Sequence, residues 1–315
     1  MKKYFSLIAI AILALGIVSC NKKVDYNYSV ELSCVYDDAQ KAPAVTVTLS
    51  EEGTPFVLDF LPEDIAAKAK EADIFAAIVQ KYGNNLKDLA RDKSGTYYFR
   101  DNIWSPGKSY TFVAFAIDLN TLQQVSSMAT TSITIPEKSN NQLTLTYDSY
   151  ANDSVIYVKT TNNAPYYITI VEDSTYVKYI ESGATDIEQF VALQMKADMD
   201  ESKAAFPERE FAEIFDKYKY EGDMDFNFID EFYTDFLKGK YHALAVGVEM
   251  VTSTADFRIL PTTKGYECAF ELQKDYIQPA EKRALLHGKN VPFKRMQRLN
   301  NVKIDVIKMH TPTLK

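Results

Sequence analysis

The sequence predicts a mainly β protein with α insertions, organised as two consecutive sheet domains that each contain helices. Three observations support this prediction. Short runs rich in β-branched and aromatic residues recur along the chain, as expected of strands. Stretches with helical periodicity interrupt them at about 62–92 and about 173–219. The same order of strands and helices then occurs twice, on either side of a polar linker at 137–141.

The first predicted domain covers 28–136 and begins with three strands, at 28–36, 44–49 and 55–61. Pro62 ends the third strand and opens the helical insert, because proline fits the start of a helix better than its interior. Apolar residues 74, 75, 78 and 79 then follow helical spacing, and Gly83 suits the helix C-terminus. A second short helix is expected through 86–89. Strands at 96–99, 110–117 and 131–135 complete this domain.

The second predicted domain covers 142–275 and repeats this plan. Its strands are expected at 142–147, 154–160, 165–171, 224–228, 241–250 and 265–272. Asp186 is a candidate N-cap for a helix that carries Phe190, Val191 and Met195 on one face. Pro207 is expected to begin a further helix. Two landmarks align the halves, since 54–60 parallels 164–170 and 107–117 parallels 239–248.

The segment from Trp104 to Tyr110 contains Pro106 and Gly107 and leads into a predicted core strand. It resembles the corresponding segment of fibronectin type III domains. The resemblance implies a β-sandwich with a tyrosine corner, in which a phenol hydroxyl bonds to upstream backbone. Tyr241 is the corresponding residue of the second half, where the turn is one residue shorter and lacks the proline. The fold is therefore expected to be two tandem fibronectin type III or immunoglobulin-like sandwiches, each carrying a helical insert.

The first nineteen residues resemble a lipoprotein signal peptide. Two lysines precede an apolar stretch at 5–18, which is shorter than the roughly 17–25 residues that a membrane-spanning helix needs. Residues 17–20 read Ile-Val-Ser-Cys, which resembles a bacterial lipobox. The resemblance implies that Cys20 is acylated, with palmitate among its chains, and that 20–27 form a tether. An ordinary signal peptide with an incidental Cys20 is the alternative.

Together, these features resemble the tandem-domain surface lipoproteins of Bacteroidota. The resemblance implies a lipid anchor in the outer membrane, with either face of that membrane open, and a role in adhesion or ligand binding outside the cell. Glycans and proteins are the candidate ligands. An accessory glycan hydrolase and a scaffold of an envelope assembly are the alternatives, because a glycosidase needs only two suitably placed carboxylates.

The charge distribution excludes one class of partner and separates one segment. The chain has a net charge of −8, and an acidic chain does not favour nucleic acid. The region 276–315 is expected to form a basic C-terminal extension: from residue 279 onward it holds nine basic and two acidic residues. This extension is either solvated, docked on the acidic second domain, or bound to a polyanion.

No motif predicts catalysis, a cofactor or a metal. Residues 223–227 imitate half of a calcium loop, but their alternation favours a strand. The three histidines are scattered, and His242 is expected to be structural. Cys34 and Cys268 are expected to be buried core residues in different domains. Tyrosines cluster between 147 and 179, which favours a sheet core over a glycan-stacking platform.

Overall fold

The computed structural model describes residues 26–149, 154–227, 235–252, 256–277 and 313–314. The predicted signal peptide, Cys20 and nearly all of the basic extension therefore lie outside the described residues. The described residues form two compact units. The first comprises 26–102, 107–136 and 313–314, and the second comprises 103–106 and 137–277.

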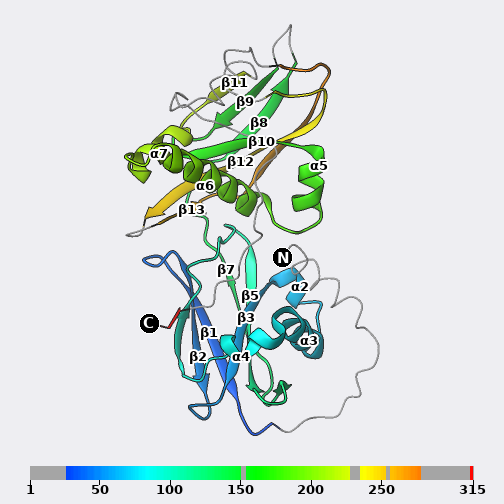
Figure 1. Cartoon of the computed structure of the whole chain (residues 1–315), viewed down its shortest axis with the longest axis vertical. Coiled ribbons are helices and arrows are strands. Elements are labelled where there is room, and N and C mark those ends of the chain that lie inside the picture. Colours follow the sequence, from blue (N-terminus) through cyan, green and yellow to red (C-terminus); the bar gives the residue numbers. More distant parts are fainter. Residues whose placement is uncertain (1–25, 150–153, 228–234, 253–255, 278–312, 315) are drawn as a thin grey trace. The chain divides into compact units, whose positions relative to one another are not determined.

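The first unit contains two antiparallel sheets (Figure 1). Its strands are β1 Val30–Asp37, β2 Ala42–Leu49, β3 Phe56–Pro62, β4 Gly95–Tyr98, β5 Ser109–Asp118, β6 Gln123–Gln124, β7 Ala129–Thr134 and β15 Thr313–Leu314. One sheet has the order β1-β2-β4-β15, and the other places β5 between β3 and β7, with β6 on the end of β5. In β2, Val45, Val47 and Leu49 are buried while Thr46 and Thr48 are exposed, as expected of a sheet with one face in a core.

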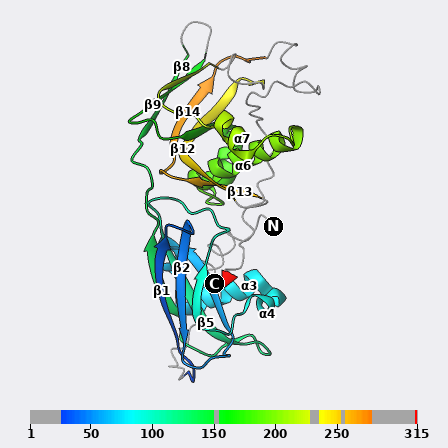
Figure 2. The ribbon, with the colours of Figure 1, turned by 90° about the vertical axis from the view of Figure 1, so that its left-hand side faces the viewer.

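The second unit repeats this strand order. Its strands are β8 Leu143–Asp148, β9 Val155–Thr160, β10 Tyr166–Glu172, β11 Met224–Asn227, β12 Gly239–Thr252, β13 Phe257–Pro261 and β14 Tyr266–Leu272. One sheet has the order β11-β9-β8, and the other places β12 between β10 and β14. Figure 2 shows β12 beside β14. In each unit the two sheets thus correspond to strands A, B, E and C, F, G of immunoglobulin-like sandwiches. Strand β13 is an addition, paired with the far end of β12.

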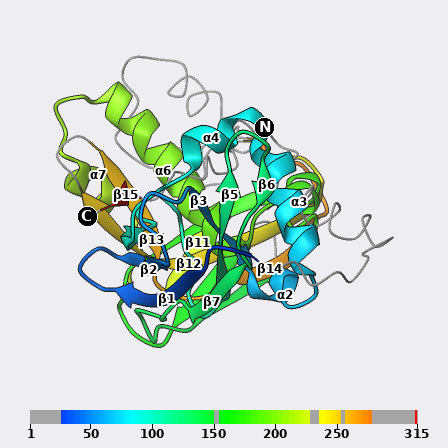
Figure 3. The ribbon, with the colours of Figure 1, turned by 90° about the horizontal axis from the view of Figure 1, so that it is seen from below.

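A helical insert separates β3 from β4 in the first unit. It consists of α2 Glu63–Ala66, α3 Glu71–Tyr82, the 3₁₀ turn η1 Gly83–Asn85 and α4 Leu86–Leu89. Helix α3 buries Ile74 and Ile78 against Val57 and Val113 of the β3–β5 sheet, and Figure 3 shows α3 beside these strands. The helix ends at Gly83, whose φ of 50° is a conformation that glycine adopts readily.

The second insert follows β10. It consists of α5 Asp173–Tyr176, the π-helix η2 Val177–Glu181, α6 Ile187–Ala205 and α7 Phe211–Tyr218. Helix α6 packs across β10, β12 and β13 (Figure 1). The side chain of Asp186 caps α6 as expected, by accepting a hydrogen bond from the Gln189 amide at 2.9 Å.

The prediction that Pro207 begins a helix is wrong, because α7 begins at Phe211. The intervening residues form a turn in which the Arg209 amide donates to the Phe206 carbonyl at 3.1 Å. The Lys203 ammonium bonds to the carbonyls of Pro207 and Arg209, so these groups are satisfied without a helix.

The structure confirms the mainly β class with α insertions. Residues 224–227 of the calcium-like segment form strand β11, with Phe226 buried and Asp225 exposed. Asp223 accepts a hydrogen bond from the Thr160 amide at 2.8 Å, which ties β11 to β9. The sequence prediction missed β13, whose short apolar run resembles many others in the chain.

Candidate binding site beside strand β12

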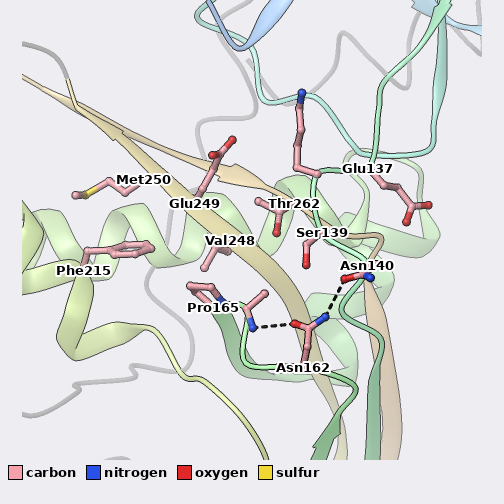
Figure 4. Close-up of a pocket in the computed structure, with 12 residues that line it drawn as sticks. Glu137, Ser139, Asn140, Asn162, Pro165, Phe215, Val248, Glu249, Met250 and Thr262 are labelled. Carbon is pink, nitrogen blue, oxygen red and sulfur yellow. Dashed lines mark hydrogen bonds between the residues drawn. The ribbon is translucent and has the colours of Figure 1, made fainter. Parts of the chain in front are cut away.

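A cavity of about 980 Å³ lies in the second unit, beside the far half of β12 (Figure 4). Four segments line most of it: 137–140, which precede β8; 162–165, which lead into β10; Phe215 of α7; and Val248, Glu249 and Met250 of β12. Distant parts of the chain therefore meet at one strand, which makes this cavity the candidate functional site.

The cavity exists because β12 is longer than its neighbour β10. The Val248 amide donates to the Pro165 carbonyl at 3.0 Å, but proline has no N–H with which to return the bond. Immediately before it, the Ala164 amide donates to the Asn162 side chain at 2.8 Å, in a turn that leads the chain away. Strand β12 continues to Thr252, paired with β13 on its other side. The part of β12 that extends beyond β10 has an open edge, and this edge forms one wall of the cavity.

The predicted linker forms the polar wall. The amides of Lys138 and Ser139 each donate to the Thr262 carbonyl at 3.0 Å. Further along, the Asn162 side chain donates to the Asn140 side chain at 2.9 Å, and Figure 4 shows this pair at one end of the cavity. Residues 138–140 are therefore bound to the second unit, although their polar composition alone suggested a free connection.

Asn141 fixes this wall to the unit. Its side chain is buried; the oxygen accepts from the amides of Thr161 and Asn162 at 3.1 and 3.2 Å, and the amide nitrogen donates to the Ala164 carbonyl at 3.1 Å. One side chain thus satisfies three main-chain groups in the loop that precedes β10. Buried polar groups of this kind are costly to leave without partners, so the contacts hold the loop in place.

The opposite wall is apolar. Even-numbered residues of β12 face the helices, as His242 does, whereas Tyr241, Ala243 and Ala245 face the sandwich core. Val248 and Met250 therefore lie on the helix side, where Phe215 completes an apolar surface with them (Figure 4). Helix α7 is held nearby by Phe211, whose ring centroid lies 4.5 Å from that of Phe257.

The charged side chains on the lining are Glu137, Lys138 and Glu249. With the two asparagines and Thr262, they offer hydrogen-bond donors and acceptors next to an apolar strip. A cavity of this composition suits binding, because apolar contact supplies affinity and a few polar groups fix orientation. Across the described residues, no group of three or more histidine, cysteine or acidic side chains is arranged to hold a metal ion.

Gly247 allows the close approach of the chain at the base of this site. A Cβ atom at this position would lie 2.6 Å from Thr262 Oγ1 and 2.7 Å from the Thr263 methyl group. The Gly247 amide donates to Thr263 Oγ1 at 2.9 Å, and its carbonyl accepts from the Thr262 amide at 2.8 Å. Glycine is needed here so that the turn after β13 can bond directly to β12.

A second polar cluster surrounds His242 of β12. Nδ1 lies 2.7 Å from Glu267 Oε1, and Nε2 lies 3.0 Å from Asp173 Oδ1. The Tyr176 ring stacks on the imidazole with centroids 3.8 Å apart, and its hydroxyl donates to Glu267 at 2.6 Å. Burial, together with the Glu267 carboxylate, raises the pKa of Tyr176 to about 12. Both imidazole nitrogens are engaged by protein groups, so the cluster holds α5 against the sheet.

The residues of the predicted tyrosine corners are placed as follows. The Tyr241 hydroxyl donates to the Leu237 carbonyl at 2.8 Å, four residues upstream, which is the bond that such a corner makes. Tyr110 is buried and packs edge-to-face on Phe60, with centroids 6.0 Å apart. Gly107, at φ 76°, donates from its amide to the Ile135 carbonyl at 2.8 Å.

Trp104 and Pro106, the remaining residues of the first predicted corner, belong to the second unit. Trp104 is buried, and it lies with Pro106 in the segment 103–106 that forms part of the second unit. In that segment, Ser105 Oγ donates to Asp186 Oδ2 at 2.7 Å. The prediction treated Trp104 to Tyr110 as one structural motif, whereas the structure divides it after Pro106.

Three of the six described tyrosines between 147 and 179 are buried, and the other three are half-buried. Tyr166, Tyr167 and Tyr179 are buried, and the Tyr167 hydroxyl donates to the buried Asp198 carboxylate at 2.5 Å. Tyr150 lies outside the described residues. The buried tyrosines pack in the interior, and no tyrosine lines the cavity beside β12.

Cys34 and Cys268 differ in part from their prediction. Both are free thiols, but each is half-buried rather than fully enclosed, because each lies on a strand face that is only partly covered. Burial still raises the pKa of the Cys34 thiol to about 12. His287 and His310 lie outside the described residues.

No family model matches the chain, and no curated protein matches it significantly. In the part of the chain that the structure describes, no helix is both long enough and apolar enough to cross a bilayer. The corner residues and the clustered tyrosines were singled out from the sequence, but none of them lines the cavity. The feature that marks the cavity is the unequal length of β10 and β12, with Pro165 immediately before the shorter strand.

Proposed function

We propose that the protein is a lipid-anchored cell-envelope protein whose second unit binds a ligand outside the cell, in adhesion or capture rather than catalysis. The cavity beside β12 is the observation that carries this proposal. It combines an apolar strip at Phe215, Val248 and Met250 with amide, hydroxyl and carboxylate groups on the facing wall. Such a lining favours recognition of a flexible polar ligand, and both glycans and peptides have this chemistry.

The proposed anchor is the diacylglyceryl group on Cys20, and the proposed location is the outer membrane. The lipobox-like residues 17–20 and the resemblance to tandem-domain Bacteroidota lipoproteins support this part. Two or more acyl chains give stable membrane attachment. In cells grown with labelled palmitate, we expect the label and the membrane fraction to be lost in the Cys20→Ser variant. Retention of both would contradict the anchor.

Ligand binding is tested with the full chain purified in a non-ionic detergent. It is applied to a glycan array and used in pull-downs from envelope extracts. The Phe215→Ser variant should lose captured ligands at least about tenfold, since it removes an aromatic anchor from the wall. Leu237→Ser is the matched control, because Leu237 is 57% exposed and lies outside the cavity lining. Capture that is absent, or equal in all three proteins, would contradict this function.

A further inference from the structure

We propose that the cavity receives an extended, basic segment of a partner protein, which adds a strand to the sheet in the place that β10 leaves open. This inference rests on the proposed binding function and names the class of ligand. Strand addition of this kind relies on unpaired main-chain groups at a sheet edge for affinity and on alternate side chains for specificity.

The main-chain geometry of β12 defines the edge. The Gly247 carbonyl accepts from the Thr262 amide, on the β13 side, whereas the Val248 amide donates to Pro165, on the β10 side. Main-chain groups alternate along a strand, so Met250 directs its N–H and C=O to the same side as Val248. Strand β10 begins only at Tyr166, and among the described residues no other strand pairs with Met250 on that side.

The residues that precede β10 do not continue this strand along the edge of β12. Pro165 lacks the donor that would bond the Val248 carbonyl, and the turn at Asn162 redirects the chain. The cavity occupies the vacated position, and its volume of about 980 Å³ leaves room for a peptide rather than a single water. An incoming strand would run antiparallel to β12, as β10 does.

The side-chain register follows from the same pairing. In an antiparallel pair, residues directly opposite one another place their side chains on one face of the sheet. A peptide residue bonded to Met250 therefore projects toward Phe215 and should be apolar. Its neighbours project to the opposite face, toward Glu249 and the segment that carries Glu137, where basic side chains suit the carboxylates.

The charge of the whole second unit favours the same ligand. Residues 137–277 contain 26 acidic and 13 basic side chains, so the field around the unit attracts cations. The required peptide alternates apolar and basic residues. The chain's own residues 302–308 have some of this character, so a peptide of that region is included below as a competing occupant.

The experiment uses fluorescein-labelled Lys-Val-Lys-Val-Lys-Val-Lys and the full chain in non-ionic detergent, with binding followed by anisotropy. One analogue carries N-methyl groups on its valines, and another carries them on its lysines. Only the valine amides face β12 when the valines face Phe215, so valine methylation should weaken binding at least about tenfold and lysine methylation should not. A Glu/Val analogue should not bind. The chemical change lies in the peptide, so the folding of the protein is unaffected.

Several results would overturn the proposal. The first is absence of peptide binding, and the second is equal binding of the two methylated analogues. The third is peptide binding to the Phe215→Ser variant that equals binding to the wild type and to the Leu237→Ser control. Glycan capture that is lost in Phe215→Ser, without any peptide binding, would leave the proposed function standing and remove this inference. A 300–308 peptide could bind more tightly than the Lys/Val peptide, and deletion of 279–315 could tighten Lys/Val peptide binding. Together, these two results would assign the edge to the chain's own tail and contradict the proposal of a partner protein.

Discussion

Asp59 of β3 organises the buried polar contacts beneath α3 in the first unit. Asp59 is only 3% exposed. Its carboxylate accepts hydrogen bonds from Lys81 Nζ at 3.0 Å, the Tyr82 hydroxyl at 3.0 Å and the Phe60 amide at 2.9 Å. Burial lowers the pKa of Lys81, while the charge of Asp59 opposes this shift. The ammonium therefore depends on its carboxylate partner to remain charged in the interior.

We predict that Asp59→Ala lowers the free energy of unfolding by about 3–5 kcal/mol, because it leaves a buried ammonium without its carboxylate. The double variant Asp59→Leu/Lys81→Met removes both charges and should recover most of this loss. Urea titrations followed by circular dichroism measure both differences. A double variant that is no more stable than Asp59→Ala would contradict the explanation.

The half-buried thiol of Cys34 is expected to be unreactive. Burial raises its pKa from 9.0 to about 12, and only the thiolate is nucleophilic. At pH 8 the folded chain should therefore alkylate about a thousandfold more slowly at Cys34 than the urea-unfolded chain. The rate should still be rising with pH at pH 10. Peptide mass spectrometry after iodoacetamide treatment measures both; equal rates in the two states would contradict the prediction.

Helix α6 covers the β10–β12 sheet, and its N-terminus depends on Asp186. The carboxylate accepts from the Gln189 amide and from Ser105 Oγ. Asp186→Ala should lower the free energy of unfolding by about 0.5–2 kcal/mol because it leaves helix amides unsatisfied, whereas Asp186→Asn keeps most of the cap. Equal urea midpoints for wild type and Asp186→Ala would contradict this role.

Elements with strong periodicity were predictable, and elements defined by tertiary partners were not. The α3 and α6 helices follow apolar spacing, and Gly83 and Asp186 mark their ends through local chemistry. The cavity depends on which strand ends first and on where 138–141 bond, and neither is encoded in composition. Asn141 illustrates this: an asparagine in a polar run reads as loop, yet its amide is buried and fixes the wall of the site.

At the scale of the molecule, the excess of acidic residues in 137–277 should govern how fast a basic peptide arrives rather than how long it stays. Lowering salt from about 150 mM to about 10 mM lengthens the screening distance from about 8 to about 30 Å, so distant carboxylates contribute to attraction. We predict that association of the Lys/Val peptide then accelerates at least about tenfold, while dissociation changes less than about threefold, since main-chain bonds to Met250 hold the bound strand. Stopped-flow anisotropy separates the two rates. A salt effect confined to dissociation would contradict long-range steering.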